Sequence, residues 1–324
     1  MRTPFRVWLV IAAMLAFALP AQAQAQDYPN KVITLVVPVP PGGAADFIAR
    51  TLGQKLQDVL GQPVVISNRG GASGTIASDN VAKAQPDGYT ILLNSITTHG
   101  IGPHLYTSLP YDSVKDFAPV TLMSRDPYVV ALPASLPSKT VKEFIALANA
   151  RQGKLLFGST GALTSTHLGA ERFRAAAGIR AQHVGFKGQS EFLIEIMADR
   201  IHFGAPGLTT ALPMIKDGKL TPLLVATPQR SPALPDVPSA GEALPAWSRD
   251  GSQAWFAPAG TPRAIRQQIS RELARQLARP EVKERLNNLA FQIAHTTPEE
   301  HEKNLRADLE TFSRIVRETG MKPR

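Results

Sequence analysis

The sequence contains no cysteine among its 324 residues. This absence excludes disulfides, cysteine-based zinc sites, iron–sulfur clusters and a lipid attached to an N-terminal cysteine. Familiar catalytic signatures are missing as well: there is no Gly-x-Ser-x-Gly elbow, no GxxxxGK[ST] or GxGxxG phosphate loop and no His-Glu-x-x-His motif. We therefore expect neither a metal nor a cofactor. Hydrophobic residues make up 44% and charged residues 19%, which is typical of globular domains and excludes general disorder.

Long apolar runs are also scarce, and the one that stands out lies at the N-terminus. Arg2 and Arg6 precede an uncharged apolar run over residues 7–19, and a proline and alternating alanines follow it. This order is typical of a cleavable secretory signal, whereas a membrane anchor needs about 20 apolar residues. We expect a signal peptide over residues 1–25, cleaved after Ala23 or Ala25, and an exported mature protein.

Basic residues outnumber acidic ones, with 35 Lys and Arg against 26 Asp and Glu. They are scattered along the chain, and no basic block is interleaved with aromatic residues. Nucleic acid is therefore not an expected partner. The positive net charge suits small anions instead.

The pattern of apolar residues predicts two α/β units, which agrees with about 150 residues per domain. Strands at residues 31–39, 63–66 and 89–93 alternate with helices at 44–60 and 76–84, and short joints between them indicate a parallel sheet covered on both faces. A similar alternation runs from residue 128 to 226. The proline-rich residues 228–245 predict a crossover or surface segment. Helices over residues 262–278, 280–288 and 298–319 follow, each with a proline at or near its first turn.

Two loops rich in Gly, Ser and Thr each lie between a predicted strand and a predicted helix. In the first loop, over residues 40–46, Gly42 and Gly43 allow the backbone to approach a ligand, and the first amides of the next helix can attract an anion. The second loop, over residues 158–165, offers hydroxyls and amides at another helix start. Ligands of open α/β sheets bind outside the carboxyl ends of the strands. Together the loops indicate a binding cleft, although each alone is also explained as an ordinary turn with an N-cap.

Short motifs in a fixed order extend over nearly the whole chain after the leader. They are Tyr28-Pro29-x-Lys31, Val36-Val37-Pro38, Pro41-Gly42-Gly43-x-x-Asp46, Asn68-Arg69 with the glycine-rich residues 70–74, residues 86–90 (PDGYT), residues 109–112 with 115–117, Ser159-x-Gly161 with His167-Leu168, Lys216-x-Gly218 with 219–220, residues 230–238 and residues 256–262. In this order the motifs closely resemble the Bug-type receptors, which are the extracytoplasmic solute-binding proteins of tripartite tricarboxylate transporters.

The resemblance implies an α/β, two-domain periplasmic-binding-protein fold of the type II-like kind, with two chain crossovers and a ligand cleft between the domains. The expected first domain is discontinuous, with residues 26–125 and 229–324, and the second contains residues 126–228. The implied ligand is a di- or tricarboxylate or a related organic acid, captured by hinge closure. The implied partners are the permease subunits of a tripartite tricarboxylate transporter, and the protein is expected to be a periplasmic monomer and not an enzyme.

The resemblance also implies which residues bind the ligand. In the first loop Pro41, Gly42, Gly43 and Asp46 are expected to hold one carboxylate, partly through water, and the second loop holds the other end through Ser159, Thr160, Gly161, Thr164 and Ser165. Residues 94–99 form a further wall, with Ser95 and Thr97 as candidates. His167 occupies a matching family position, and we interpret it as a helix-packing residue more readily than as a ligand contact.

Three departures from the family pattern bear on the ligand. Val39 replaces a frequent Phe before the first loop, and Ala162-Leu163 replace a common Asn-Gly pair. Pro206 stands where many members carry an Asp, which can pair with the ammonium of an amino acid. Leu163 and Pro206 therefore favour a less polar or aromatic acid over an amino acid.

Two other functions are compatible with an exported chain of this kind. A receptor that signals to a sensor partner cannot be separated by sequence from one that serves a permease. An exported hydrolase would use Ser159 or Ser165 with His167. Ser165 and His167 are a poor match, because residues two apart on a helix do not face each other.

Overall fold

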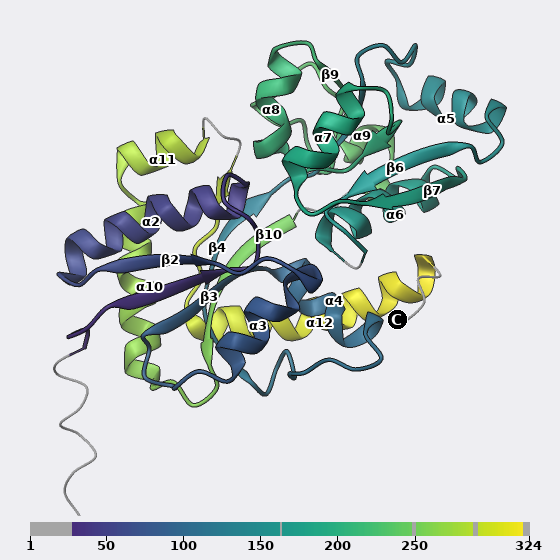
Figure 1. The fold of residues 1–324 in the computed structure, drawn as a ribbon. Helices are drawn as coiled ribbons and strands as arrows, with labels where there is room; N and C mark the ends of the chain where they lie inside the picture. The colour runs from purple at the N-terminus through teal and green to yellow at the C-terminus, as the bar shows by residue number, and fades with distance from the viewer. Residues whose placement is uncertain (1–27, 163, 248–250, 288–290, 320–324) are drawn as a thin grey trace, which may run out of the picture.

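The computed structural model describes residues 28–162, 164–247, 251–287 and 291–319. The expected signal peptide over residues 1–25 lies outside these residues, as does Leu163. None of the helices in the described ranges is both long enough and apolar enough to cross a membrane. The described chain forms two α/β domains, each built on its own β-sheet (Figure 1).

The first domain contains a six-stranded sheet in the order β11-β4-β10-β3-β1-β2. Its strands are β1 (Ile33–Val37), β2 (Val64–Asn68), β3 (Thr90–Ser95), β4 (Phe117–Asp126), β10 (Gly251–Pro258) and β11 (Gln292–Ile293). β2, β1 and β3 are parallel, whereas β10 is antiparallel to both β3 and β4, and β11 is antiparallel to β4. The sheet is thus mixed and not wholly parallel as predicted, because the C-terminal part of the chain adds returning strands.

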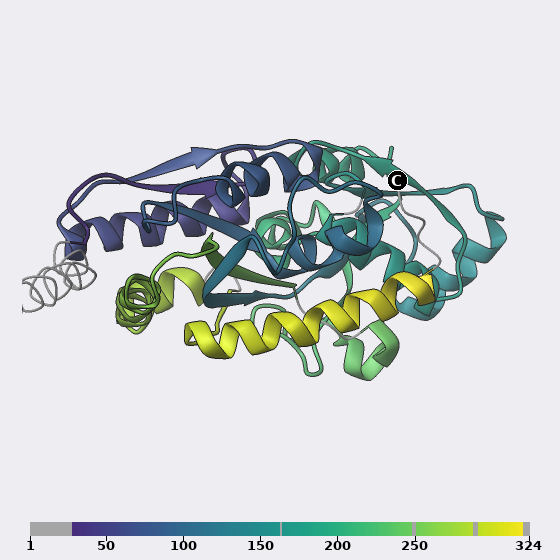
Figure 2. The same ribbon diagram turned by 90° about the horizontal axis from the view of Figure 1, so that it is seen from below.

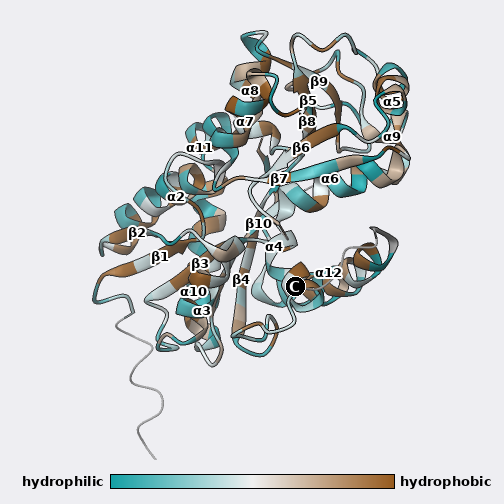
Figure 3. Ribbon diagram, turned by 45° about the vertical axis from the view of Figure 1, so that its right-hand side comes forward, coloured by the Kyte–Doolittle hydropathy of each residue, from teal (hydrophilic) through white to brown (hydrophobic). Residues whose placement is uncertain are grey.

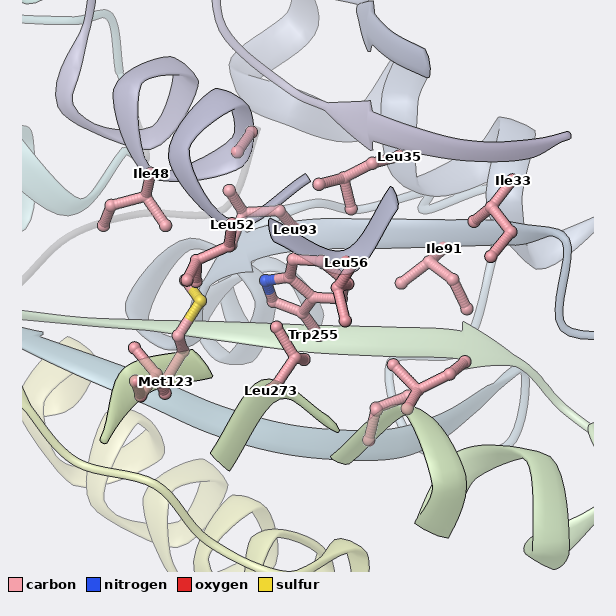
Figure 4. Close-up of a cluster of buried hydrophobic side chains, with 14 of the residues drawn as sticks. Ile33, Leu35, Ile48, Leu52, Leu56, Ile91, Leu93, Met123, Trp255 and Leu273 are labelled. Carbon is pink, nitrogen blue, oxygen red and sulfur yellow. The ribbon is translucent and has the colours of Figure 1, made fainter. Parts of the chain in front are cut away.

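Helices cover both faces of the first sheet and enclose two hydrophobic clusters. They are α2 (Ala44–Leu60), α3 (Thr75–Ala82), α4 (Ile96–Leu105), α10 (Arg263–Leu277), α11 (Pro280–Asn287) and α12 (Pro298–Thr319), with a 3-10 turn η2 (Ala72–Gly74). β10 contributes side chains to both clusters, because successive side chains of a strand point to opposite faces of the sheet. Trp255 is buried among residues of α2 and α10 (Figure 4), while Ala254 and Phe256 belong to the cluster beneath α4 and α12.

The C-terminal helix α12 completes the first domain by packing on α4 and β4 (Figure 2). Leu305, Phe312 and Ile315 lie on its buried side, at the spacing of an amphipathic helix. A Cβ atom on Gly100 of α4 would lie 2.7 Å from the ring of Phe312, so a glycine at this position allows the two helices to approach closely. Hydrophobic residues dominate the strands, and the helices carry hydrophilic residues on their outer sides (Figure 3).

The second domain contains a five-stranded sheet in the order β7-β6-β8-β5-β9. Its elements are β5 (Val129–Pro133), α5 (Val141–Ala150), β6 (Leu155–Ser159), α6 (Ser165–Ala176), β7 (Ala181–Gly185), α7 (Gln189–Met197), β8 (Phe203–Gly204), α8 (Leu208–Lys216), β9 (Leu220–Val225), α9 (Ala240–Ala243) and the 3-10 turn η3 (Pro245–Trp247). β7, β6 and β8 are parallel, and β5 is antiparallel to β8 and β9.

Two crossovers lie side by side between the sheets. The first leads from β4 to β5 through Pro127 and Tyr128, and the second leads from β9 to β10. The amide of Ala226 donates to the carbonyl of Tyr128 at 2.8 Å, and Gly251 at the start of β10 pairs with Asp126 at the end of β4. The backbone of each crossover therefore supports the other.

The proline-rich segment packs with the second domain. Trp247 is 1% exposed and belongs to the core of that domain together with Ala240, and its indole Nε1 donates to the carbonyl of Gly169 on α6 at 2.8 Å. The chain joins the first sheet again at Gly251, whereas we expected it to return to the first domain at residue 229. The difference arises because apolar residues between the prolines fill the surface of the second core.

Two histidines are buried in the first domain without ionic partners among the described residues. His99 on α4 is 0% exposed, its Nε2 is hydrogen-bonded to the carbonyl of Ser113 at 2.9 Å, and its ring stacks on Phe256. His301 on α12 is 1% exposed, and its ring centroid lies 5.1 Å from that of Phe256. Burial lowers the pKa of His99 to about 4, and burial together with His99 lowers the pKa of His301 to about 3.

We expect the free energy of unfolding to fall as the pH drops from about 6.5 to about 4. An unfolded histidine titrates near pH 6.5, so in this window the unfolded chain binds more protons than the folded chain, while above it neither histidine contributes a slope. Replacing His301 by leucine should flatten the curve in this window. Urea unfolding of both proteins at pH 5 and pH 8 measures the effect, and parallel curves for wild type and His301→Leu would contradict it.

Candidate functional site

Both sheets contain a topological switch point. In the first sheet β1 lies between β2 and β3, so the chain leaves β1 for one side and later returns to the other. In the second sheet β6 lies in the same way between β7 and β8. Loops that follow the two strands at such a point diverge and leave room for a ligand. The predicted site residues lie in the loops after β1, β6 and β8, at the last residues of β3 and β6, and in the first turns of α2, α4 and α6.

The two switch points face each other across the domain junction. The hydroxyl of Ser73, in the segment after β2, donates to the carbonyl of Ala162, in the loop after β6, at 2.7 Å. Leu168 on α6 is 2% exposed and joins the cluster of the first domain that contains Phe312 and Ile315. The carboxyl ends of the two sets of parallel strands therefore meet.

Helices α2, α4 and α8 begin at this junction without a side-chain cap. Their N-cap residues are Gly43, Ser95 and Gly207, and none of these side chains accepts a bond from the helix. Uncapped first-turn amides carry partial positive charge and suit an anion. By contrast, α5 and α9, outside the junction, each begin with a complete capping box.

The first loop is organised by Asp46. This residue is 4% exposed, and its carboxylate accepts bonds from the amide of Gly42 at 3.0 Å, Nε of Arg50 at 3.0 Å and Nδ2 of Asn68 at 2.9 Å. Burial favours a raised pKa, but the bonds from Arg50, Gly42 and Asn68 outweigh it and lower the pKa of Asp46. The carboxylate of Asp46 therefore stabilises the conformation of the first loop. Pro41, Gly42 and Gly43 are the residues of this loop that can approach a ligand.

Asn68 also joins the first loop to the neighbouring strand. Its Nδ2 donates to the carbonyl of Val39 at 3.0 Å as well as to Asp46. Val39 itself packs against the core of the first domain, in the position where a Phe was expected from the family pattern. Asn68 ends β2 and was singled out in sequence only as part of a motif, because nothing local shows that it reaches back to the first loop.

The second loop is organised by Ser159 and His183. The hydroxyl of Ser159 is hydrogen-bonded to Nε2 of His183 at 2.6 Å and to the carbonyl of Gly161 at 3.0 Å, and Ser159 is 0% exposed. Gly161 has a positive φ of 105°. His183 lies on β7 beside Ser159 and was missed by sequence reasoning, because the two residues meet only through strand pairing.

A group of threonines holds the rest of this loop. Thr164 caps α6 by accepting from the amide of His167, and its hydroxyl also donates to the carbonyl of Gly161 at 2.8 Å. The amide of Thr160 donates to the hydroxyl of Thr166 at 2.9 Å. The structure therefore brings Ser159, Thr160, Gly161 and Thr164 together, with their hydroxyls largely engaged within the loop.

The wall expected at residues 94–99 is not a loop. β3 continues to Ser95, and α4 begins at Ile96, so Thr97 lies in the first turn of a helix. The Ser95 hydroxyl is buried and has no hydrogen-bond partner among the described residues. Gln253 on β10 is the strand partner of Ser95 on β3. Its side-chain Oε1 is also buried without a hydrogen-bond partner among the described residues. These two groups are available to a ligand or to water.

A family model described as the tripartite tricarboxylate transporter family receptor matches residues 48–321. The chain belongs to this receptor family.

Individual relatives of this receptor agree with the assignment. It is 36% identical over 298 residues to a UPF0065 protein encoded between tcbD and tcbE in a Pseudomonas species, covering 91% of this chain and 88% of that protein. It is 31% identical to Protein BugT of Bordetella pertussis, covering 98% of each chain.

Solved structures show the same fold. The periplasmic binding protein BugD superposes with a TM-score of 0.86 at 26% identity, covering 92% of this chain and 100% of that one. A Rhodopseudomonas palustris protein with adipate superposes with a TM-score of 0.88 at 29% identity, covering 92% of this chain and 100% of that one. MatC of Rhodopseudomonas palustris with bound malate gives a TM-score of 0.84 at 28% identity, covering 89% and 100%.

His167 of the receptor lies inside the second domain. It is 8% exposed, its ring centroid is 4.1 Å from that of His183 and 6.0 Å from that of Phe157, and its Nε2 lies 3.8 Å from Glu171. This packing accords with our interpretation of His167 as a helix-packing residue. The hydroxyl of Ser159 is bonded to His183.

Pro206 of the receptor lies next to the first crossover. Its carbonyl accepts from the amide of Val129 at 3.0 Å, and the amide of Leu208 donates to the carbonyl of Pro127 at 2.8 Å. The hydroxyls of Thr209 and Thr210, in the first turn of α8, are buried without a partner among the described residues. These threonines are further candidates that sequence reasoning missed.

The junction also contains Tyr128, which the sequence did not single out. It is 8% exposed and lies on the first crossover. Burial raises the pKa of Tyr128, and side-chain hydrogen bonding with Ser165 and Thr97 opposes this rise. Both partners are predicted site residues, one from each domain.

Replacing Asp46 by alanine should unfold the first loop and weaken ligand binding. The amide of Gly42 and the amide of Asn68 both lose a buried acceptor, which costs about 1–3 kcal/mol. Asp58→Ala is the matched control, because Asp58 lies on the same helix and accepts only an exposed bond from Gln54. Thermal unfolding and calorimetric titration measure both effects, and equal behaviour of the two variants would contradict the role of Asp46.

Proposed function

We propose that this receptor is exported, closes its two domains on a small organic acid and delivers it to the permease subunits of a tripartite tricarboxylate transporter. The observation that carries the proposal is the meeting of two switch points, with uncapped helix N-termini and glycine-rich loops, beside paired crossovers. Such an arrangement can bury a carboxylate against neutral donors when the domains close about the crossovers. Two solved relatives, one with adipate and one with bound malate, support a carboxylate as the ligand.

The charges at the junction favour an acid without an ammonium group. The carboxylate of Asp46 is taken up by Gly42, Arg50 and Asn68, and that of Asp126 accepts from the hydroxyl of Ser124 at 2.9 Å. Pro206 contributes a carbonyl to the crossover and no carboxylate. We therefore propose di- or tricarboxylates or aromatic acids, rather than amino acids, as the ligand class.

A cavity of about 580 Å³ between α2 and α11 is a poor alternative site. Arg50 pairs there with Asp46, Lys55 lies 3.9 Å from Glu281, and the guanidinium of Arg285 lies over the ring of Phe47. Two of the three cations that line this cavity already have a carboxylate beside them, and all the residues that line it belong to the first domain, so the cavity does not lie between the two switch points.

A hydrolase is disfavoured by the surroundings of the candidate nucleophile. Ser159 bonds to His183 as a nucleophile bonds to a base, but it is 0% exposed, and its hydroxyl also lies 3.0 Å from the carbonyl of Gly161. A serine nucleophile must present its oxygen to a substrate and needs an oxyanion hole beside it. The pair is better explained as a support for the second loop.

Thermal unfolding of the mature protein with a panel of acids tests the proposal. The panel contains adipate, malate, citrate, benzoate and aspartate, each at about 100 times a typical Kd, where binding adds about 2.7 kcal/mol to the free energy of unfolding. We expect a rise in Tm with one class of non-amino acid and compaction in small-angle scattering. Selective stabilisation by aspartate would contradict the ligand class, and no response to any acid would contradict the receptor function.

Gly161→Ala should abolish this response. Gly161 has a φ of 105°, and an added Cβ would lie 3.7 Å from the carbonyl oxygen of Phe186 and 3.8 Å from the hydroxyl of Ser73. Gly178→Ala is the control: φ there is 62°, with nothing within 4 Å, and Gly178 follows the far end of α6. Both variants lose stability through backbone strain, but only Gly161→Ala should lose binding in calorimetry. Equal binding by both variants would remove the second loop from the site.

The delivery step needs a separate experiment. Photo-crosslinking of the ligand-loaded protein in membranes of the source cells should capture permease subunits. Capture of a sensor protein alone would favour the signalling receptor instead.

A further inference from the structure

We propose that Ser95 and Gln253 form a subsite that selects acids carrying a hydroxyl group near the carboxylate. The inference rests on the proposed function, because it concerns the ligand of the same receptor. It goes further by naming the chemical feature of the acid that the first domain recognises. The subsite also gives a role to two buried side-chain oxygens that belong to neither binding loop.

The two side chains belong to a polar row that crosses three neighbouring strands of the first sheet. Ser95 on β3 pairs with Gln253 on β10, and Gln253 pairs with Ser124 on β4. Directly paired residues present their side chains on the same face of a sheet, with Cβ atoms about 4.5–5.5 Å apart. Trp255, two residues after Gln253, faces the core that contains residues of α2 and α10. The row therefore lies on that face of the sheet as well.

This polar row lies next to the first loop. β1, which leads into that loop, is a neighbour of β3, and β10 pairs with β3 on its other side. Neighbouring strands are about 4.8 Å apart. A carboxylate held at Gly42 and Gly43 would thus be one strand away from Ser95 and two strands away from Gln253. Both residues of the row are half-buried, with the unpartnered oxygen of each turned inward.

The unpartnered groups on this face need both a donor and an acceptor. Within the described ranges, Oε1 of Gln253 lacks a donor, Nε1 of Trp255 lacks an acceptor, and the hydroxyl of Ser95, which can act as either, has no partner. Figure 4 shows the indole nitrogen of Trp255 on the side of its ring toward the start of β10. A carboxylate only accepts and an ammonium only donates, whereas a hydroxyl does both. A hydroxyl therefore matches these groups better than either charged group.

A second carboxylate is further disfavoured at the row by Asp126. The side chain of Asp126 is 6% exposed, and its carboxylate accepts from the hydroxyl of Ser124 at 2.9 Å. Because Ser124 is the strand partner of Gln253, this negative charge lies on the same face of the sheet. Another anion would be repelled there, whereas a neutral hydroxyl would not. The row thus suits the hydroxyl of an acid whose carboxylate is held by the first loop.

Malate, succinate and aspartate test this choice, because they differ only in carrying a hydroxyl, a hydrogen or an ammonium on the same carbon. We expect titration calorimetry of the mature protein to give a Kd for malate at least about 10-fold below those of the other two, since one or two buried hydrogen bonds are gained. Citrate and tricarballylate, which also differ by one hydroxyl, repeat the comparison for a tricarboxylate.

Gln253→Met removes the amide and keeps the length of the side chain. It should weaken malate binding about 3- to 10-fold and change succinate binding by less than about 2-fold. Ser95→Ala removes only a hydroxyl that has no partner in the described part of the chain, and it should act in the same direction. Gln292→Met is the matched control, because Gln292 lies on the edge strand β11 of the same sheet and is exposed.

The outcomes separate this inference from the proposed function. If succinate or aspartate binds as tightly as malate, or if adipate or benzoate binds and no hydroxyl-bearing acid does, the subsite is wrong and the receptor function stands. A malate-to-succinate ratio that is unchanged in both Gln253→Met and Ser95→Ala would assign the row to a buried water and would also overturn the subsite. If no acid binds at all, the receptor function fails, and the subsite fails with it.

Discussion

Two crossovers that lie side by side connect the domains of this receptor, and the candidate site depends on them. Each domain has its own sheet and its own hydrophobic clusters. The crossovers are paired through Ala226 with Tyr128 and through Gly251 with Asp126. In the function that we propose, these paired crossovers are the hinge about which the domains open and close. The switch points of both sheets lie beside these crossovers, where a ligand of open α/β sheets is expected to bind.

The candidate site suits anions although the charged side chains near it are already paired or packed. The buried carboxylate of Asp46 serves the loop around it, and the cations near it on α2 and α11 are paired or packed. What remains at the junction is a set of helix N-termini and neutral hydroxyls. Neutral donors hold a carboxylate without the large desolvation penalty of a buried cation. The buried side-chain oxygens of Ser95, Gln253 and Thr209, which have no hydrogen-bond partner within the described part of the chain, are further polar groups available there.

Buried hydrogen bonds between polar residues hold the two loops and α6 in place. His183 holds Ser159, Asn68 holds Asp46 and Val39, and Trp247 of the proline-rich segment holds the carbonyl of Gly169 on α6. Each pair joins a residue at a strand end or helix to one far away in the chain. Loops that carry glycine are flexible on their own, so these anchors supply the rigidity that a preformed site requires.

The sequence by itself determined the α/β class, the glycine-rich loops at the ends of predicted strands and the family. These features follow from local periodicity and from short motifs, which are properties of neighbouring residues. It did not reveal α4, because Gly100, Gly102 and Pro103 lower the helix propensity of that stretch and only packing against α12 compensates. Nor did it reveal that Asp46 faces its own loop or that Ser159 meets His183. Those facts belong to tertiary structure, because each depends on a contact between segments that only the folded sheets and paired crossovers bring together.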